Sequence, residues 1–379
     1  MIVSREREEI DLMLVKGNNL SKKNIDNILL IQLGDIGDVV LSFPCVRALR
    51  ENFPQANVLV AVREKAKELI EDCRWATDVI SINEEERTWI EELRYQKRVF
   101  SRLRGFHFDL VIDIKPGDRG AILAFLSGAP QRVSFYANDG KLWRNRVFTH
   151  LATDEPTLGR HMVQYYLGLL ETYNIKTDHI RPEHDVPEYR HQEAKALLRN
   201  EGVQSDRPII AVQPFSLWKY KEWGADKYIQ LINWLTSEYN VSIVITGAMD
   251  ERERACEIIK ECPRNTFNLA GKTSIGTLAA VFKRCKLFVG VDSAGVHIAA
   301  AVGLPTVCIF GPSSYIDWAP RGKQHQVVHK DFPCVPCQNK GCQGSEISRC
   351  LEELTVEEVK AIVELHYLKT AKHKVEKGT

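Results

Sequence analysis

The sequence lacks an excess of charge of either sign, and it lacks any apolar run that could cross a membrane. Its 51 Lys and Arg residues are balanced by 50 Asp and Glu residues, so no overall field attracts nucleic acid. The longest apolar runs, residues 294–302 and 306–310, are far shorter than the roughly 20 residues of a membrane helix. The N-terminus is polar and charged, unlike a signal peptide. We therefore expect a cytoplasmic protein that binds no nucleic acid.

Cysteine is scarce outside one segment. Six of the ten cysteines are scattered through the chain, as is usual for reduced and mostly buried thiols. The other four lie in residues 334–350, interleaved with Pro and Gly, and are Cys334, Cys337, Cys342 and Cys350. The first pair has the spacing of a metal knuckle, so a structural Zn or Fe site with four thiolate ligands is one hypothesis. Reduced free thiols are the alternative, and disulfides are disfavoured in a reducing compartment.

The length and the hydrophobic pattern predict two α/β domains. The chain has 379 residues, of which 44% are hydrophobic, enough for two separate cores. In both halves short apolar runs alternate with helical segments, which predicts βαβ units and mainly parallel sheets. The expected strands contain residues 28–31, 58–62, 79–82 and 108–114 in the first half, and 209–212, 241–246, 267–271, 287–291 and 306–310 in the second.

A polar, proline-bearing stretch separates the two halves and sets the expected domain boundaries. The predicted organisation is an N-terminal extension (1–24), a first domain (25–180), a linker (181–207), a second domain (208–352) that includes the Cys-rich loop, and a C-terminal helix and tail (353–379). Within the last segment we expect a helix over about residues 355–368.

Residues 87–104 are predicted to form a basic amphipathic helix. Apolar and aromatic residues such as Trp89 and Leu93 alternate with Arg94, Lys97 and Arg98. Such a helix could lie against anionic lipid headgroups. A surface helix packed on the sheet is the more frequent explanation of the pattern.

The stretch from Leu287 to Gly303 has the pattern of a strand, a tight turn and a helix. Asp292 or Ser293 can cap the helix, and Ala294 and Gly295 have almost no side chain. Backbone N–H groups at the positive end of the helix dipole could then bind an anion, most plausibly a diphosphate. An ordinary capped strand-to-helix junction is the alternative.

A second turn between a strand and a helix carries two acids. Gly34-Asp-Ile-Gly-Asp38 follows the first expected strand, at the edge of the sheet where α/β proteins bind ligands. Its spacing is not G-x-G-x-x-G, so it is no dinucleotide fingerprint. One interpretation is that Asp35 and Asp38 cap the following helix, and the other is that one of them serves as a general base.

Several motifs in order along residues 26–360 resemble glycosyltransferase family 9, the ADP-heptose:lipopolysaccharide heptosyltransferases. The motifs are Ile36-Gly-Asp-Val-Val with Pro44 and Leu49-Arg50, Lys221-Glu-Trp, Gly247-Ala before an acidic run, Leu269-Ala-Gly-Lys-Thr, Val291-Asp-Ser-x-x-x-His297 and Phe310-Gly-Pro312. The resemblance implies a GT-B fold, in which two Rossmann-like domains face each other across a cleft. The first domain would bind the acceptor and the second the nucleotide sugar, and transfer would need no metal.

The resemblance also implies roles for single residues. Asp38 matches the general base that deprotonates the acceptor hydroxyl, and Lys221 matches the lysine that neutralises the departing diphosphate. The expected donor-binding residues are Ser216, Glu251, Asp292, Ser293, Ala294, Gly295 and His297. Of these, Ser216 would contact phosphate, Glu251 would accept the ribose hydroxyls, and Asp292 would face the donor sugar. His297 could reach the same site or be a satisfied core histidine.

The sequence departs from the family pattern at three positions. Asp35 stands where many members carry a small residue, so the base could be Asp35 or Asp38. Lys115 replaces a frequent Gln, whereas Arg119 keeps a basic residue expected to meet an anionic acceptor. Ala294 replaces a Gly, which costs little unless the backbone requires a positive φ. Asp35, Lys115 and Arg119 are therefore the expected acceptor-binding residues.

The resulting hypothesis is an inverting transferase that moves heptose from ADP-heptose to the lipopolysaccharide inner core, with Kdo or heptose as acceptor. The enzyme would be cytoplasmic and peripheral to the inner membrane, where it would meet its lipid A-core acceptor. The alternatives are a family 9 transferase with a protein or other glycan acceptor, a GT-B sugar-nucleotide epimerase, and a binding protein without catalysis.

Overall fold

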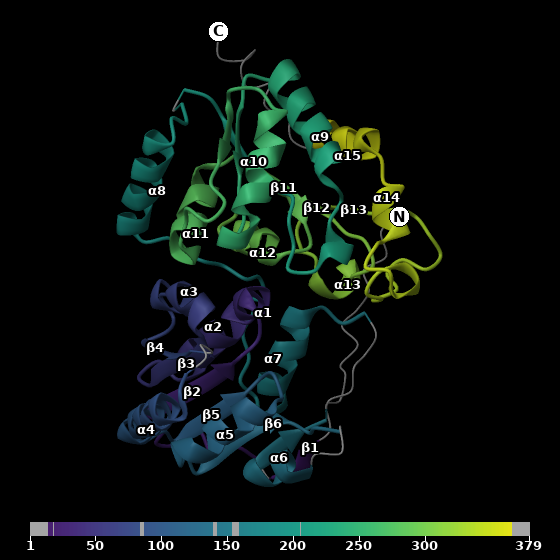
Figure 1. The fold of residues 1–379 in the computed structure, drawn as a ribbon. Coiled ribbons are helices and arrows are strands. Elements are labelled where there is room, and N and C mark those ends of the chain that lie inside the picture. The colour runs from purple at the N-terminus through teal and green to yellow at the C-terminus, as the bar shows by residue number, and fades with distance from the viewer. Residues whose placement is uncertain are drawn as a thin grey trace. The chain divides into compact units, whose positions relative to one another are not determined.

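The computed structural model describes residues 14–17, 19–83, 87–138, 142–153, 159–204 and 206–365, which form two α/β units (Figure 1). By their contacts, the described residues up to Gly34 and Ser42–Ile180 form the first unit. Asp35–Leu41 and the residues from Arg181 onward form the second. The short helix α1 (Ile36–Leu41) therefore groups with the second unit, where it packs on helix α12 (Ala294–Ala301).

The first unit is built on a seven-stranded sheet with the order β1-β7-β6-β5-β2-β3-β4. Its strands are β1 (Leu14–Lys16), β2 (Asn27–Gln32), β3 (Asn57–Arg63), β4 (Asp78–Ile82), β5 (Leu110–Asp113), β6 (Gln131–Phe135) and β7 (His150–Ala152). All neighbouring strands are parallel except the edge pair β1–β7, which is antiparallel. The central strands β2 and β5 are buried on both faces, as expected for a parallel sheet covered by helices.

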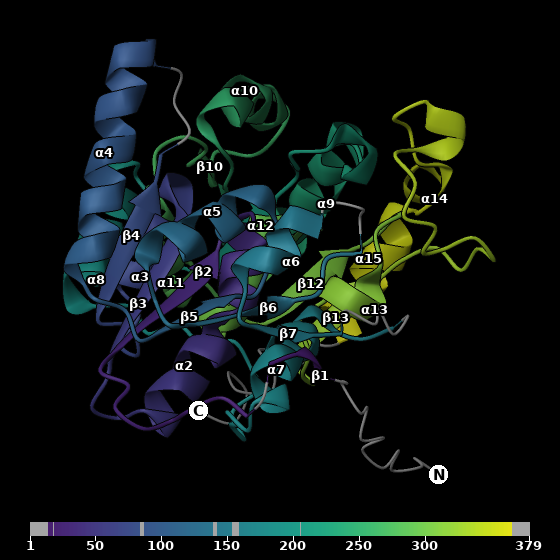
Figure 2. The ribbon, with the colours of Figure 1, turned by 90° about the horizontal axis from the view of Figure 1, so that it is seen from below.

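Helices cover both faces of this sheet (Figures 1 and 2). The helices are α2 (Phe43–Asn52), α3 (Lys67–Glu71), α4 (Trp89–Gly105), α5 (Asp118–Ser127), α6 (Leu142–Val147) and α7 (Met162–Thr172). Right-handed crossovers place α2 and α3 on one face and α4, α5 and α6 on the other. Helix α7 packs with α2, and α5 packs between α4 and α6.

The second unit contains a six-stranded, fully parallel sheet with the order β10-β9-β8-β11-β12-β13. Its strands are β8 (Ile209–Gln213), β9 (Ser242–Ile245), β10 (Thr266–Asn268), β11 (Leu287–Val291), β12 (Thr306–Ile309) and β13 (His325–Val328). Besides α1 and α12, its helices are α8 (Glu188–Asn200), α9 (Ala225–Glu238), α10 (Arg252–Lys260), α11 (Ile275–Arg284), α13 (Tyr315–Trp318), α14 (Arg349–Glu352) and α15 (Val356–Val363).

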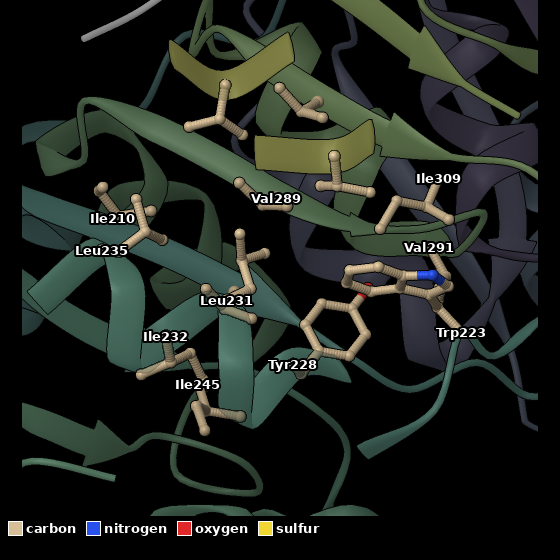
Figure 3. Close-up of a cluster of buried hydrophobic side chains, with 14 of the residues drawn as sticks. Ile210, Trp223, Tyr228, Leu231, Ile232, Leu235, Ile245, Val289, Val291 and Ile309 are labelled. Carbon is tan, nitrogen blue, oxygen red and sulfur yellow. The ribbon is translucent and has the colours of Figure 1, made fainter. Parts of the chain in front are cut away.

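The core of the second unit joins the sheet to α9 and to the C-terminal helices (Figure 3). The rings of Trp223 and Tyr228 pack edge to face, with 5.1 Å between their centroids. The indole N–H of Trp223 donates a 2.8 Å hydrogen bond to the Leu354 carbonyl, so the buried polar atom of this large side chain is satisfied. Because Trp223 closely follows Lys221 in the chain, this anchor limits the movement of the loop after β8.

The predicted fold class, two α/β domains with parallel sheets, is confirmed by these strand orders. The sequence did not indicate four strands, β1, β6, β7 and β13. The single helix expected after residue 38 is two helices, α1 and α2, which meet at Ser42, and Pro44 occupies the first turn of α2. Part of the expected helix at 355–368 and most of the expected extension 1–24 lie outside the described residues.

Helix α4 is the basic amphipathic helix that the sequence predicts. It begins with a capping box, in which the Glu91 carboxylate accepts hydrogen bonds from the N–H and hydroxyl of Thr88. On one side Val99 and Leu103 are buried in the core of the first unit. On the other side the helix is exposed and basic. Among the described residues, neither this helix nor any other is both long and apolar enough to cross a membrane.

Asp113 is a fully buried carboxylate at the carboxyl end of β5, beside the end of β2. These two strands meet where the strand order reverses, which is where open α/β sheets bind ligands. Its Oδ1 accepts a long 3.4 Å hydrogen bond from the Lys115 N–H, and its Oδ2 has no hydrogen-bond partner among the described residues. Burial raises the pKa of Asp113 well above its ordinary value of 3.8, while the Lys115 N–H and the charge of Arg144 act in the opposite direction.

We predict that Asp113→Asn becomes more stable relative to the wild type as the pH rises. In the unfolded chain Asp113 loses its proton near its ordinary pKa of 3.8, whereas the folded chain retains it. Above that pH the folded state therefore binds more protons, and its free energy of unfolding falls with rising pH until the folded pKa is passed. The variant lacks this proton uptake.

The measurement is thermal unfolding of both proteins at several pH values between 4 and neutrality. The exposed Asp178 offers a matched control, because Asp178→Asn should change the Tm by the same small amount at every pH. A Tm difference between wild type and Asp113→Asn that does not change with pH would contradict a raised pKa.

Candidate functional site

The candidate site lies in the second unit, at the carboxyl edge of its sheet. Loops after β8 and β11 supply Ser216, Lys221, Asp292 and Ser293, and the turn after β9 supplies Glu251. In a parallel sheet the carboxyl ends of all strands lie at one edge, so residues distant in sequence meet there. The expected donor-binding residues are therefore gathered by strand order, and their contacts define what each can do.

Lys221 and Asp292 form an ion pair, with 2.7 Å between Nζ and Oδ2. The Asp292 side chain is 8% exposed and that of Lys221 22%. Because the pair is largely shielded from water, its attraction is stronger than that of a surface pair. It ties the 3₁₀ turn Lys219–Lys221 to the turn between β11 and α12. A cation is thus held beside the first turn of a helix.

Ser216 also contacts the turn between β11 and α12. Its hydroxyl donates a 3.2 Å hydrogen bond to the Asp292 carbonyl, and its N–H donates to Glu222 at 3.2 Å. Glu222 in turn accepts hydrogen bonds from Arg254, whose guanidinium lies 4.6 Å from the centre of the Phe215 ring. The hydroxyl of Ser216 would have to turn away from Asp292 before it could donate to a phosphate.

The first turn of α12 offers backbone N–H groups. Ser293 is the N-cap residue but makes no side-chain capping hydrogen bond. Its Oγ instead accepts a 3.0 Å hydrogen bond from the buried Gln213 Nε2. The N–H groups that begin a helix have no partner within it, and with the helix dipole they favour an anion. Ala294 is not among the described residues with a positive φ, so its departure from Gly causes no backbone strain.

Gly295 makes room for the side chain that supports this turn. A Cβ added at Gly295 would lie 2.0 Å from Gln213 Oε1. That oxygen also accepts a 3.2 Å hydrogen bond from the buried Thr246 hydroxyl. The Gln213 amide therefore joins the ends of β8 and β9 to the start of α12. Any larger residue at position 295 must displace it.

His297 is buried, with 5% of its surface exposed. Burial lowers the pKa of His297, the carboxylates of Asp292 and Asp38 raise it, and Lys221 lowers it. The net effect lowers the pKa of His297 from its ordinary value of 6.5, which favours the neutral imidazole at pH 7. Its Nδ1 has no hydrogen-bond partner within the described structure.

Helix α1 approaches the His297 ring closely. A Cβ at Gly37 would lie 2.9 Å from His297 Cδ2, so a glycine is needed for α1 and α12 to pack at this distance. The next residue, Asp38, is 5% exposed and is one of the carboxylates that act on the pKa of His297. This packing places Asp38 and Asp292 around one imidazole.

Asp38 also caps its own helix. Its Oδ2 accepts a 2.9 Å hydrogen bond from the Asp35 N–H, as a carboxylate at the third position of a helix does in a capping box. The Asp35 side chain is exposed, whereas Asp38 is buried. The cap holds the Asp38 side chain in place.

Glu251 ends the 3₁₀ turn Met249–Glu251 after β9. Its Oε2 accepts a 2.7 Å hydrogen bond from the Ala248 N–H. Burial is the main cause that raises the pKa of Glu251, and the carboxylates of Asp250 and Glu222 add to it. The Ala248 N–H and Arg254 oppose the shift. A carboxylate so placed is held in a fixed direction.

The two basic residues expected at the acceptor belong to the first unit. Lys115 is exposed in the loop after β5. Arg119 lies in the first turn of α5, and its guanidinium donates a 3.3 Å hydrogen bond to the Asn83 carbonyl, just after β4. Both therefore lie at the carboxyl edge of the first sheet, whereas the third expected acceptor residue, Asp35, groups with the second unit.

The four clustered cysteines line one cavity of about 560 Å³ in the second unit. The cavity lies between Pro312 and the segments before and within α14. Within the described ranges, no group of three or more His, Cys, Asp or Glu side chains is arranged to hold a metal. The hypothesis of a four-thiolate Zn or Fe site is thus not supported by this structure. All four are free cysteines, and burial raises the pKa of Cys350 to about 11, against the thiolate form.

Three residues of the site were missed by the sequence reasoning: Gln213, Glu222 and Arg254. Gln213 is a polar residue that ends a buried apolar strand directly before a proline, and that position is a usable signal. Glu222 lies inside the Lys221-Glu-Trp motif, where only the lysine was considered. Arg254 carries no local signal, because its partner is 32 residues away in the chain.

Comparisons with known proteins show to which family the chain belongs. The model of "Glycosyltransferase family 9 (heptosyltransferase)" matches residues 96–347, about two-thirds of the chain. Lipopolysaccharide heptosyltransferase 3 of Escherichia coli K12 is 27% identical over 289 residues, covering 75% of this chain and 82% of the relative. Lipooligosaccharide heptosyltransferase 2 of Campylobacter jejuni is 25% identical over 330 residues, covering 86% and 94%.

A solved structure extends the likeness to the fold. The ADP-heptose lipopolysaccharide heptosyltransferase II of E. coli superposes with a TM-score of 0.75 and 21% identity, covering 91% of this chain and 99% of that one. The two Rossmann-like sheets are thus those of a GT-B protein. The chain belongs to glycosyltransferase family 9 and is a glycosyltransferase of the GT-B fold.

Proposed function

We propose that this enzyme transfers heptose from ADP-heptose to the inner core of lipopolysaccharide, with Kdo or heptose as acceptor and with inversion at the anomeric carbon. The observation that carries the proposal is the shielded Lys221–Asp292 ion pair beside the first turn of α12. Lys221 supplies a cation, and the first turn of α12 supplies N–H groups, at a place where a diphosphate can bind. The relatives named as heptosyltransferases support the choice of donor and acceptor.

The donor binds through three kinds of contact in this proposal. The diphosphate is held by Lys221, by the N–H groups of Ala294 and Gly295, and by the hydroxyls of Ser216 and Ser293 after rotation. Glu251 accepts the two ribose hydroxyls. Asp292 faces the heptose while it holds Lys221, and the neutral His297 donates or accepts a hydrogen bond at the same place.

The chemical step is a single displacement. Asp38 takes the proton of the acceptor hydroxyl, and the hydroxyl oxygen forms a bond to the anomeric carbon of heptose. The bond from that carbon to the diphosphate breaks, and ADP leaves with the electron pair. Lys221 and the helix N–H groups neutralise the charge that develops on the diphosphate. We propose that the step needs no metal, because these groups supply the positive charge.

The acceptor side is served by Lys115 and Arg119, whose positive charges suit an anionic sugar lipid, and by Asp35. The lipid-linked acceptor places the reaction at the cytoplasmic face of the inner membrane. A protein or other glycan acceptor, and an epimerase that acts on the nucleotide sugar alone, are the competing functions.

The deciding experiment incubates the enzyme with ADP-heptose, with and without deacylated lipopolysaccharide core, and measures ADP release. Release that depends on the core, together with a heptosylated product in the mass spectrum, supports the proposal. Turnover of the nucleotide sugar without any acceptor would favour the epimerase, and no turnover with the core would favour another acceptor.

We predict that Asp38→Asn slows transfer by about 100-fold or more, the usual contribution of a general base, while ADP binding stays unchanged. Asparagine keeps an oxygen that can accept the Asp35 N–H, so the cap of α1 is retained and only the base is lost. Transfer is followed as ADP release, and ADP binding by calorimetry. Asp35→Asn is the matched comparison: it removes an expected acceptor contact, so KM for the acceptor should rise while kcat stays near the wild-type value. The opposite pattern in the two variants would make Asp35 the base.

We also predict that Lys221→Ala lowers kcat by about 100-fold, as the loss of one charge-stabilising group commonly does. The variant leaves Asp292 without its partner, so the Tm is measured in parallel to separate misfolding from lost catalysis. Lys221→Arg keeps the charge and should recover part of the rate. EDTA should not change the wild-type rate. A Lys221→Ala enzyme with the wild-type kcat would remove the lysine from the step.

A further inference from the structure

Exposed apolar side chains gather on the outer side of α4, α5 and α6 in the first unit. Large side chains that are exposed there, which we call the α4–α6 face, are Trp89, Leu93, Phe100, Ile122, Phe125 and Trp143. Helix α5 packs against both α4 and α6, and the three helices lie side by side over one face of the sheet (Figures 1 and 2). An exposed apolar group of this size marks an interaction surface.

Helix α5 is apolar on both of its sides. Ala121, Leu123 and Ala124 are buried in the core of the first unit. On the outer side Ile122 is exposed, and Phe125 is 62% exposed. A helix that is apolar all round is usually covered all round. The outer side of α5 therefore has the composition of a surface that becomes covered.

Helix α4 adds an apolar stripe with basic residues beside it. Trp89 is 73% exposed and Leu93 61% exposed, one turn apart on the same side of the helix. Phe100 continues this stripe towards the end of α4. Exposed basic residues on the solvent side of α4 are Arg94, Lys97 and Arg98.

The acidic residues of α4 are used locally. Both lie in the first turn of the helix. Glu91 accepts the capping hydrogen bonds of Thr88, and Glu92 is paired with Arg87 at 3.3 Å and with Gln96. The rest of the exposed side of α4 is therefore positively charged.

The stripe of α4 is continuous with α5. The Arg104 guanidinium lies 5.6 Å from the centre of the Phe100 ring. It also lies against Gly128, the residue that ends α5. Phe100 and Arg104 are thus on the side of α4 that faces α5, and the apolar groups of the two helices form one surface.

We propose that the α4–α6 face docks on an anionic lipid membrane. Basic side chains suit the anionic headgroups of such a membrane, and exposed tryptophan and leucine side chains suit the acyl boundary beneath them. Tryptophan, which is present on both α4 and α6, is enriched at the level of the headgroups. A second copy of the chain on this face would set its basic residues against one another. The proposal rests on the proposed function in one respect, because a lipid-linked acceptor is the reason for the enzyme to dock.

The test is cosedimentation of the full chain with vesicles of phosphatidylethanolamine and phosphatidylglycerol, and with neutral phosphatidylcholine vesicles. The wild type should bind the anionic vesicles, less so as salt is raised, and should bind the neutral ones weakly. A triple variant, Trp89→Ser with Leu93→Ser and Phe125→Ser, should lose about tenfold or more of its binding. So should Arg94→Gln with Lys97→Gln and Arg98→Gln.

Matched controls come from the second unit. Ile347 is 53% exposed and Lys195 is exposed, so Ile347→Ser and Lys195→Gln should bind vesicles like the wild type. The two triple variants should keep the wild-type Tm and the wild-type rate on a soluble, deacylated acceptor. Membrane docking is in this way measured apart from transfer, and either can fail without the other.

Three outcomes would overturn the proposal. The first is a wild type that does not bind the anionic vesicles, and the second is triple variants that bind them as well as the wild type does. The third is a wild type that is dimeric in light scattering while the apolar triple variant is monomeric, which would assign the α4–α6 face to a second copy of the chain.

Discussion

The ion pair between Lys221 and Asp292 is the interaction on which the candidate site depends. A lysine in a loop ordinarily extends into water, where its charge is screened and its position undefined. Here the 2.7 Å contact with a nearly buried carboxylate fixes the ammonium group beside the start of α12. A cation, a helix N-terminus and two hydroxyls then share one edge of the sheet. That combination suits the diphosphate of a nucleotide sugar.

Buried polar side chains behind the pair hold these groups in place. Gln213 joins Thr246 to Ser293, and Glu222 joins Ser216 to Arg254. A buried polar group left without a partner costs free energy, so these networks restrict each loop to few conformations. Trp223 is hydrogen-bonded to Leu354 in the core, and this anchor limits the movement of the loop after β8. The site is thus rigid where charge must be positioned, which is the condition for electrostatic stabilisation of a departing diphosphate.

The first unit carries the features that suit the proposed docking on a membrane. Its sheet presents Lys115 and Arg119 at the carboxyl edge, while the helices on one face carry exposed aromatic residues and basic charge. An acceptor with a lipid part needs an enzyme that can reach the membrane without crossing it. Helices that lie on the surface of a bilayer meet this need, because their apolar side chains enter the acyl boundary while their basic side chains stay with the headgroups.

The sequence by itself determined the α/β class, nine of the strands and the family, because apolar runs, turns and short motifs are local signals. It also placed Asp38, Lys221 and Asp292 in loops that follow strands. It did not reveal β1, β6, β7 and β13. Polar residues interrupt the apolar pattern in β6 (Gln131, Arg132) and in β13 (His325, Gln326), and β1 and β7 have only three residues each. Only the tertiary structure decided which side chains meet. The pairing of Lys221 with Asp292 spans 71 residues, and that of Gln213 with Ser293 spans 80. Such partners are brought together by the order of strands in the sheet, and no local pattern records that order.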